Sequence, residues 1–165
     1  NGASYLGGLD ISAEAVNKAS GFCDKVELAD LESDTFPFET DFFDIVVSFE
    51  VLEHLRDPSL YLNEISRVLR KDGVCLLSFP NLTSFSSRIR MLAGRKAVSF
   101  GDKTHLRHYI HGEVEALLGS HGFVVEFLPT GFTLNPFNLK SRFRFPSHRC
   151  VRSLEDGIVL KMQHA

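Results

Sequence analysis

The sequence predicts an α/β fold whose sheet is doubly wound and mostly parallel. Short apolar runs at residues 43–49 and 74–79 are typical of parallel strands that are buried on both faces. A helical pattern lies between them, and strand, helix and strand at this length form a right-handed crossover unit. The first run continues into Glu-x-x-Glu-His at residues 50–54. Ligands in open α/β sheets bind beyond the carboxyl ends of the strands, so we expect polar chemistry there.

Length and composition fit one globular domain, residues 1–165. The chain is 44% hydrophobic and 24% charged, which is ordinary for a folded protein. Its net charge of −3 gives no argument for a nucleic-acid partner. No apolar run approaches the roughly 20 residues of a membrane span. Cys23, Cys75 and Cys150 show no metal-ligand spacing, and we expect free thiols in a reducing, cytoplasmic location.

The predicted elements follow the order strand, helix, strand, strand, helix, strand, helix, strand, strand. They occupy residues 5–10, 12–21, 26–30, 43–49, 57–73, 74–79, 113–120, 123–128 and 157–162. The last two strands leave no room for a helical crossover, so we take the final strand as antiparallel. We expect residues 82–110 to form a lid or substrate segment over the strand ends. Residues 130–153 are expected to form a loop, which is basic and aromatic from 137 to 152.

Local signals delimit the first two helices. Ser12 is a suitable N-cap for the first helix, and Gly21 is expected to end it. Asp57 is expected at the N-cap of the central helix, and Gly73 is expected to supply its left-handed C-terminal position. The apolar face of that helix is predicted to consist of Tyr61, Ile65, Val68 and Leu69.

Two glycines interrupt the first predicted strand. Gly7 and Gly8 indicate either a close approach of another part of the chain or a weak point in the strand. They do not form a phosphate-binding loop, because no dinucleotide-type spacing follows them.

Together these motifs resemble the class I S-adenosylmethionine-dependent methyltransferases. The resemblance spans nearly the whole chain, and its parts are GLDIS at 8–12, Asp30-Leu31 ahead of FPF at 36–38, FFDIV at 42–46, LEHL at 52–55, EISRVL at 64–69 and FPN at 79–81. Each motif alone is common, and their order and spacing carry the resemblance. The small-molecule branch is the most similar, namely the methyltransferase type 11 and MetW-like proteins. The resemblance implies a Rossmann-like fold and S-adenosylmethionine as cofactor.

The resemblance assigns cofactor contacts to three strand ends. Asp10, followed by Ile11, matches the acid that binds the ribose hydroxyls, and a carboxylate has the acceptors that this needs. Asp30 matches the acid that accepts from the adenine amino group, and Leu31 would add a backbone amide and an apolar wall. Contacts to the methionine part are implied for Ser48, Phe49 and Glu50.

The family's glycine-rich loop has no counterpart in the sequence. In the family this loop follows the first strand and holds the methionine part of the cofactor, and here it would precede Asn1. We therefore expect a fragment that is truncated at its N-terminus. The missing strand would lie in the middle of the sheet, between the strands that end at Asp10 and Phe49.

Histidines are the candidate catalytic and substrate groups. Methyl transfer needs an aligned nucleophile and exclusion of water, and a general base helps when the acceptor is a hydroxyl or an amine. His54, just past a strand end, is the candidate base, and a hydrogen bond that caps the loop is the alternative. His105, His108 and His111 recur every three residues, and nothing in the sequence supplies a clear carboxylate or thiolate partner for them. We therefore expect no metal, and we expect His105 and His108 on the substrate side.

Three functions remain open. The first is S-adenosylmethionine-dependent methyl transfer to a small molecule. The second, which the missing glycine loop favours, is a catalytically silent Rossmann-like module that binds protein. The third is a nicotinamide-dependent dehydrogenase, against which Asp30, the Leu-Glu-His turn and the antiparallel last strand argue. We expect a small-molecule substrate, no nucleic acid and no membrane span, and a homo-oligomer if association completes the sheet.

Overall fold

A parallel strand pair forms the centre of the computed structural model, which describes residues 2–97, 100, 102–128, 132–133, 142–143 and 157–165. The two strands are β3 (Phe43–Phe49) and β4 (Leu69–Pro80). A 3₁₀ turn, η1 (Leu52–His54), and helix α2 (Ser59–Val68) connect them. This confirms the predicted crossover unit, because β-branched and aromatic residues favour the strands while the i, i+4 apolar spacing favours the helix.

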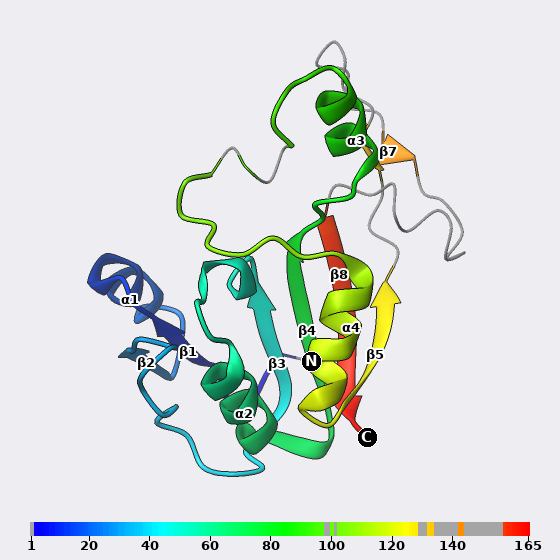
Figure 1. Ribbon diagram of the computed structural model, residues 1–165. Coiled ribbons are helices and arrows are strands. Elements are labelled where there is room, and N and C mark those ends of the chain that lie inside the picture. The colour runs from blue at the N-terminus through cyan, green and yellow to red at the C-terminus, as the bar shows by residue number, and fades with distance from the viewer. Residues whose placement is uncertain (1, 98–99, 101, 129–131, 134–141, 144–156) are drawn as a thin grey trace.

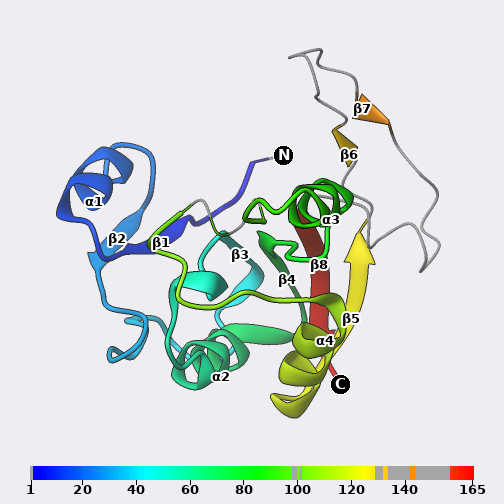
Figure 2. The same cartoon turned by 45° about the horizontal axis from the view of Figure 1, so that its top comes forward.

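Two antiparallel strands extend this sheet. β8 (Gly157–His164) pairs with β4, and β5 (Phe123–Leu128) pairs with β8, so the strand order is β3-β4-β8-β5. The predicted antiparallel last strand is confirmed. Helix α4 (His111–Ser120) precedes β5 and lies on the same face of the sheet as α2 (Figures 1 and 2).

The first part of the chain forms a separate small sheet. β1 (Gly7–Asp10) and β2 (Lys25–Leu28) pair in parallel, and helix α1 (Ala13–Ala19) connects them. The Ser12 hydroxyl accepts from the Ala15 amide, which confirms the predicted N-cap. In the described part of the chain, β1 and β3 do not pair with each other, so each has one free edge.

The segment between β4 and α4 crosses the carboxyl ends of β3 and β4 (Figure 1). It contains helix α3 (Phe85–Leu92), and Asn81 forms a parallel bridge with Tyr109 at the end of β4. Its role as a lid stays a prediction. Two short strands, β6 (Phe132–Thr133) and β7 (Arg142–Phe143), pair antiparallel, and most of the predicted basic loop at 137–152 lies outside the described residues.

One apolar core joins these elements. Its fully buried side chains include Leu52, Leu62, Ile65, Leu69, Leu77, Phe79, Val114, Leu118, Leu160 and Met162. The predicted apolar face of α2 is confirmed for Tyr61, Ile65 and Val68, which are buried, whereas Leu69 is buried as the first residue of β4. Leu9 and Leu31 pack against this core from the small sheet and its following loop, so the two sheets share it. No helix among the described residues combines the length and apolarity that a membrane crossing requires.

The ends of several elements differ from the sequence prediction. α2 ends at Val68 because Leu69 already pairs with Phe43, and the chain bulges before Val74 pairs with Ile45. Gly73 therefore lies in the bulged part of β4 and does not cap a helix. At the other end Pro58 is the N-cap residue, although the Asp57 carboxylate accepts from the Ser59 amide. The C-cap of α1 is Ser20, one residue before the predicted Gly21.

β3 is not buried on both faces as predicted. Ile45, Val47 and Phe49 alternate along one face of the strand and are 62%, 56% and 53% exposed. β3 is an edge strand among the described residues, and none of them covers this face. An apolar run is thus compatible with one exposed face, because periodicity alone does not report what covers a strand.

A partly buried ion pair between Glu64 and Arg67 fixes the loop before β3 to α2. Glu64 Oε2 accepts from the Phe36 amide at 2.6 Å and from Arg67 Nη2 at 2.7 Å. Arg67 also donates to the carbonyl oxygens of Phe36 and Phe38. The Arg67 guanidinium holds the pKa of the Glu64 carboxyl below its usual value.

Gly7→Ala should destabilise the fold, whereas Gly8→Ala should not. A Cβ at Gly7 would lie 2.9 Å from the Phe38 ring. That ring packs edge to face against Phe43, so moving it aside would cost free energy. We expect a loss of about 1–3 kcal/mol in the free energy of unfolding. At Gly8 the nearest atom would be 3.6 Å away, which is ordinary contact. Urea unfolding measures both variants, and equal effects would contradict the proposed close approach.

Glu64→Gln should lower stability by about 1–3 kcal/mol at pH 7, as expected for a hydrogen-bonded buried charge. Because the folded-state pKa of Glu64 is depressed, its contribution is present above the unfolded pKa and is lost as pH falls through the folded pKa. The difference between wild type and variant should therefore shrink below about pH 4.5. Glu14→Gln, which removes the exposed Glu14–Lys18 pair, is the matched control and should change stability little. A pH-independent difference would contradict this assignment.

Candidate functional site

A sharp turn follows β3 at the carboxyl end of the central sheet. Glu50 adopts a left-handed conformation with φ of 55°, which is uncommon for a residue other than glycine. Its amide donates to the Ser78 carbonyl at 3.1 Å, and its Oε1 accepts from Ser78 Oγ at 2.9 Å. Leu52 and Leu55 are then buried in the core. We call residues 50–55 the β3 turn.

Two distant segments are hydrogen-bonded to this region. Glu32, in the loop after β2, accepts from the backbone amides of Arg56 at 2.5 Å and Asp57 at 3.2 Å. The carbonyl of Glu53 accepts from the amides of Leu106 and Arg107 at 2.9 and 3.0 Å. The segment before α4 therefore meets the β3 turn, and the loop after β2 meets the two residues that follow this turn.

The two predicted aspartates lie at the carboxyl end of the β1–β2 pair. Asp10 is exposed, and its Oδ1 accepts from the Ser12 amide at 2.8 Å. Asp30 Oδ1 accepts from the Glu32 amide at 2.9 Å, which shapes the loop that reaches the β3 turn. Their neighbours differ, since Ile11 is 70% exposed whereas Leu31 packs on the core. The geometry thus brings both acids to the strand ends where the sequence predicts a ligand site.

The three predicted residues at the end of β3 face different directions. Ser48 is buried, and its hydroxyl forms a short hydrogen bond with the Tyr61 hydroxyl. Burial raises the pKa of Tyr61, so this phenol stays protonated. Phe49 is half exposed, and Glu50 is exposed beside Ser78. The side chain of Ser48 is thus occupied in the core, and any ligand contact at Ser48 would come from its backbone.

His54 lies at the end of η1 and meets the segment before α4. Its Nδ1 is 3.1 Å from the Thr104 carbonyl, so the loop-capping bond considered from the sequence is present. The rings of His54 and His105 meet edge to face, with centroids 5.0 Å apart. Contrary to the sequence-based expectation, two carboxylates accompany these histidines. His105 Nε2 lies 4.0 Å from Glu53 Oε1 and 3.9 Å from Asp102 Oδ2.

Glu53 is the most unusual acid of the site. It is 1% exposed, and neither carboxylate oxygen has a hydrogen-bond partner. Burial raises the pKa of this carboxyl, and the nearby charge of Glu50 acts in the same direction. Sequence reasoning treated Glu53 only as part of a motif. Glu53 is buried beside Leu52 because the turn packs into the core. This packing involves distant residues, so the local sequence pattern does not predict it.

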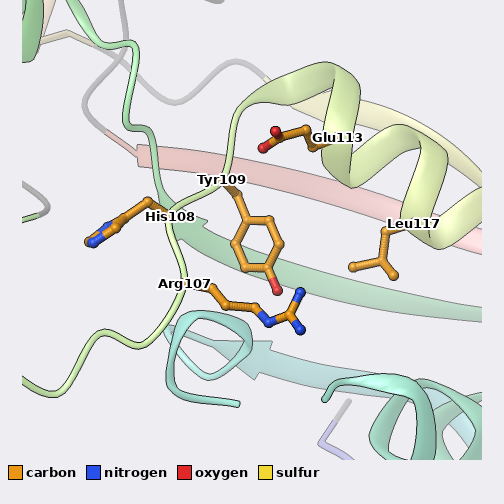
Figure 3. A pocket seen from close by; sticks show the side chains of 5 residues that line it. All are labelled: Arg107, His108, Tyr109, Glu113 and Leu117. Carbon is orange, nitrogen blue, oxygen red and sulfur yellow. The ribbon is translucent and has the colours of Figure 1, made fainter. Parts of the chain in front are cut away.

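A pocket of about 310 Å³ lies beside the site, between the segment before α4 and α4 itself. It is lined by Arg107, His108, Tyr109, Glu113 and Leu117, and Figure 3 shows Tyr109 beside Arg107 while His108 projects to the other side of the backbone. The Tyr109 hydroxyl is buried beside the Arg107 guanidinium, and burial raises the pKa of Tyr109. Burial lowers the pKa of His108. Of the two predicted substrate histidines, His108 therefore lines the pocket and His105 belongs to the Glu53 cluster.

Known proteins share both the sequence pattern and the fold. Residues 1–77 match the family model described as a methyltransferase domain. A probable S-adenosylmethionine-dependent methyltransferase of Mycolicibacterium smegmatis is 33% identical over 119 residues, which are 72% of this chain and 43% of that protein. One from Mycobacterium tuberculosis is 31% identical over 116 residues, 70% of this chain and 39% of that protein. The matched region thus spans less than half the length of these relatives.

Solved structures agree on the fold. A methyltransferase from Thermotoga maritima superimposes with a TM-score of 0.71 at 19% identity, covering 96% of this chain and 72% of that one. A Haloferax volcanii methyltransferase, solved in complex with the Trm112 methyltransferase activator, gives 0.68 at 19% identity, covering 99% and 73%. These matches confirm the Rossmann-like α/β prediction. By its sequence over residues 1–77 and by its fold, the chain is therefore similar to S-adenosylmethionine-dependent methyltransferases.

Proposed function

We propose that this protein binds S-adenosylmethionine and transfers its methyl group to a small-molecule acceptor. One observation carries the proposal. Asp10 ends β1 and Asp30 lies two residues after the end of the parallel strand β2, and Glu32 hydrogen-bonds the loop that contains Asp30 to the region just after the β3 turn. The carboxylates of Asp10 and Asp30, which are far apart in the sequence, therefore both lie at the carboxyl ends of the strands. Ligands of α/β proteins bind at this end of the sheet.

The donor and acceptor chemistry of these acids suits the cofactor. Asp10 is oriented by the Ser12 amide at one oxygen, and a carboxylate retains further acceptor positions for a pair of ribose hydroxyls. Asp30 and the amide of Leu31 are suited to the adenine, with Ile11 as an apolar neighbour. Phe49 and Glu50, with the backbone of Ser48, would contact the methionine part. S-adenosylmethionine supplies an electrophilic methyl group when it is bound.

We place the acceptor at the segment before α4. His54 is the proposed general base. A carbonyl oxygen only accepts, so the hydrogen bond to Thr104 requires a proton on Nδ1 of His54. Nε2 of the neutral ring then carries the lone pair that takes a proton from a hydroxyl or amine acceptor. His105 and His108 would orient the acceptor, because this segment crosses the strand ends at Asn81 and Tyr109.

A cytoplasmic location is part of the proposal. Cys23 and Cys75 are free thiols, and Cys150 lies outside the described residues. Burial raises the pKa of Cys75 to about 12, so this thiol is unreactive at neutral pH. Unpaired cysteines are typical of reducing compartments.

Calorimetric titration with S-adenosylmethionine tests the proposal. Asp10→Asn should weaken binding by about tenfold or more, since charge-assisted hydrogen bonds contribute roughly 1.5–3 kcal/mol each. Asp72→Asn makes the same chemical change in β4, near the opposite end of the strands, and should leave the dissociation constant unchanged. Equal affinity in wild type and Asp10→Asn would refute the role of Asp10. Absence of binding by the wild-type chain would refute cofactor binding itself.

The exposed face of β3 favours a second candidate, a catalytically silent module that pairs with another copy of itself. Ile45, Val47 and Phe49 present an apolar row on a strand with a free edge, and such edges pair readily with other strands. Association there would add a strand to the sheet without any ligand.

Sedimentation equilibrium at a protein concentration of about 100 µM tests whether the chain dimerises, as this second candidate requires. The wild-type chain should dimerise and Val47→Lys should remain monomeric, because a lysine on an edge strand opposes pairing with another strand. Val124→Lys is the matched control, since Val124 is 61% exposed on β5 at the other edge of the same sheet, and it should not affect the dimer. A monomeric wild type would exclude this second candidate.

A further inference from the structure

The strongest unassigned feature is the polar cluster where the β3 turn meets the segment before α4. Glu53, His54 and His105 each offer one ligand atom, and these three atoms all lie within 4.8 Å of one another. The three residues come from two segments that are far apart in the chain and that are joined by backbone hydrogen bonds at Glu53. The cluster is therefore built by the fold and not by a flexible surface.

The Glu53 carboxylate indicates that a cation belongs in this cluster. A buried carboxylate without partners costs several kcal/mol unless it is paired, neutralised or bound to a metal. Among the described residues, Glu53 is 1% exposed and has no hydrogen-bond partner at either oxygen, and His105 Nε2 lies 4.0 Å from its Oε1. That distance is too long for a hydrogen bond. A metal ion between the two residues would give the Glu53 carboxylate a partner.

The hydrogen bonding of His54 has the form found in metal centres. Ligating histidines commonly donate their second ring N–H to a backbone carbonyl, which fixes the tautomer and the ring orientation. His54 does this through Nδ1 to Thr104, which leaves the lone pair on Nε2. The same lone pair cannot serve as a general base while it binds a metal, so the two uses of His54 exclude each other.

A fourth donor is close. Asp102 Oδ1 accepts from the amide and hydroxyl of Thr104, while Oδ2 faces His105 at 3.9 Å. Two imidazoles with one or two carboxylates suit zinc and similar transition metals, whereas magnesium and calcium prefer oxygen ligands alone.

We propose that Glu53, His54 and His105 bind one divalent transition-metal ion of the zinc type, with Asp102 as a fourth donor. Bonds of about 2 Å bring ligand atoms to about 3.3 Å from one another, so small side-chain rotations close the cluster around the ion. The ion would fasten the segment before α4 to the β3 turn, at the place where Glu53 already accepts from Leu106 and Arg107. Nothing in this inference depends on methyl transfer.

Competition with a chromophoric zinc chelator tests the site in the 165-residue chain after removal of bound metal by dialysis. Wild type should bind one Zn²⁺, and Glu53→Gln and His105→Ala should each weaken that binding by about tenfold or more, as loss of a metal ligand does. His121→Ala is the matched control, because His121 lies at the end of α4 and hydrogen-bonds Leu117. It should bind Zn²⁺ as wild type does. Circular dichroism of each apo variant checks that it is folded.

Two further readouts separate this site from other zinc-binding groups. Co²⁺ should give the visible spectrum of a nitrogen and oxygen site, and a thiolate charge-transfer band would place the ion on a cysteine and overturn the proposal. Zn²⁺ should raise the melting temperature of wild type but not of His105→Ala, because only the folded state holds the cluster together. Unchanged zinc affinity in both ligand variants, or no zinc binding by wild type, would also overturn it. Mg²⁺ at the same concentration should have no effect.

Discussion

Burial of the β3 turn in the apolar core is the constraint on which the candidate site depends. Leu52 and Leu55 are buried away from water. Burial of apolar surface stabilises the folded state by about 25 cal/mol per Å², so these two side chains hold the turn in place. The polar groups between and around them must then find partners at fixed positions. Glu50 bonds Ser78 across the sheet, the Glu53 carbonyl takes two amides from the segment before α4, and His54 bonds Thr104. A hydrophobic anchor thus organises a polar site.

A few side-chain contacts explain why two separate sheets act as one structure. β1 and β3 are not hydrogen-bonded to each other in the described part of the chain, so backbone pairing does not align the small sheet with the central one. The alignment instead comes from apolar packing of Leu9 and Leu31 on the shared core and from Glu32, whose carboxylate spans to Arg56 and Asp57. The position of Asp30 relative to the end of β3 therefore depends on a few side-chain contacts. This makes ligand binding at the site sensitive to residues that never touch the ligand.

The sequence predicts those features that arise from local pattern. Apolar runs, the Ser12 cap and the absence of a crossover before the last strand predicted the strands, α1 and the antiparallel β8. The resemblance to methyltransferases singled out Asp10 and Asp30, and Asp10 ends β1 while Asp30 follows β2. What escaped prediction depends on contacts between distant residues: His54 and Thr104 are 50 positions apart, and Glu32 and Arg56 are 24 apart. The exposed face of β3 escaped for the same reason, since an apolar strand looks alike whether or not another element covers it.

Amide hydrogen exchange at the β3 turn tests this account most directly. The amides of Arg56, Asp57, Leu106 and Arg107 are bonded to Glu32 and Glu53 near the surface. If the buried turn joins the three segments, these amides should exchange about as slowly as those of β4, because only a large opening exposes them. Exchange at the rate of exposed loops, with β4 still protected, would show that the segments move independently and would contradict the account.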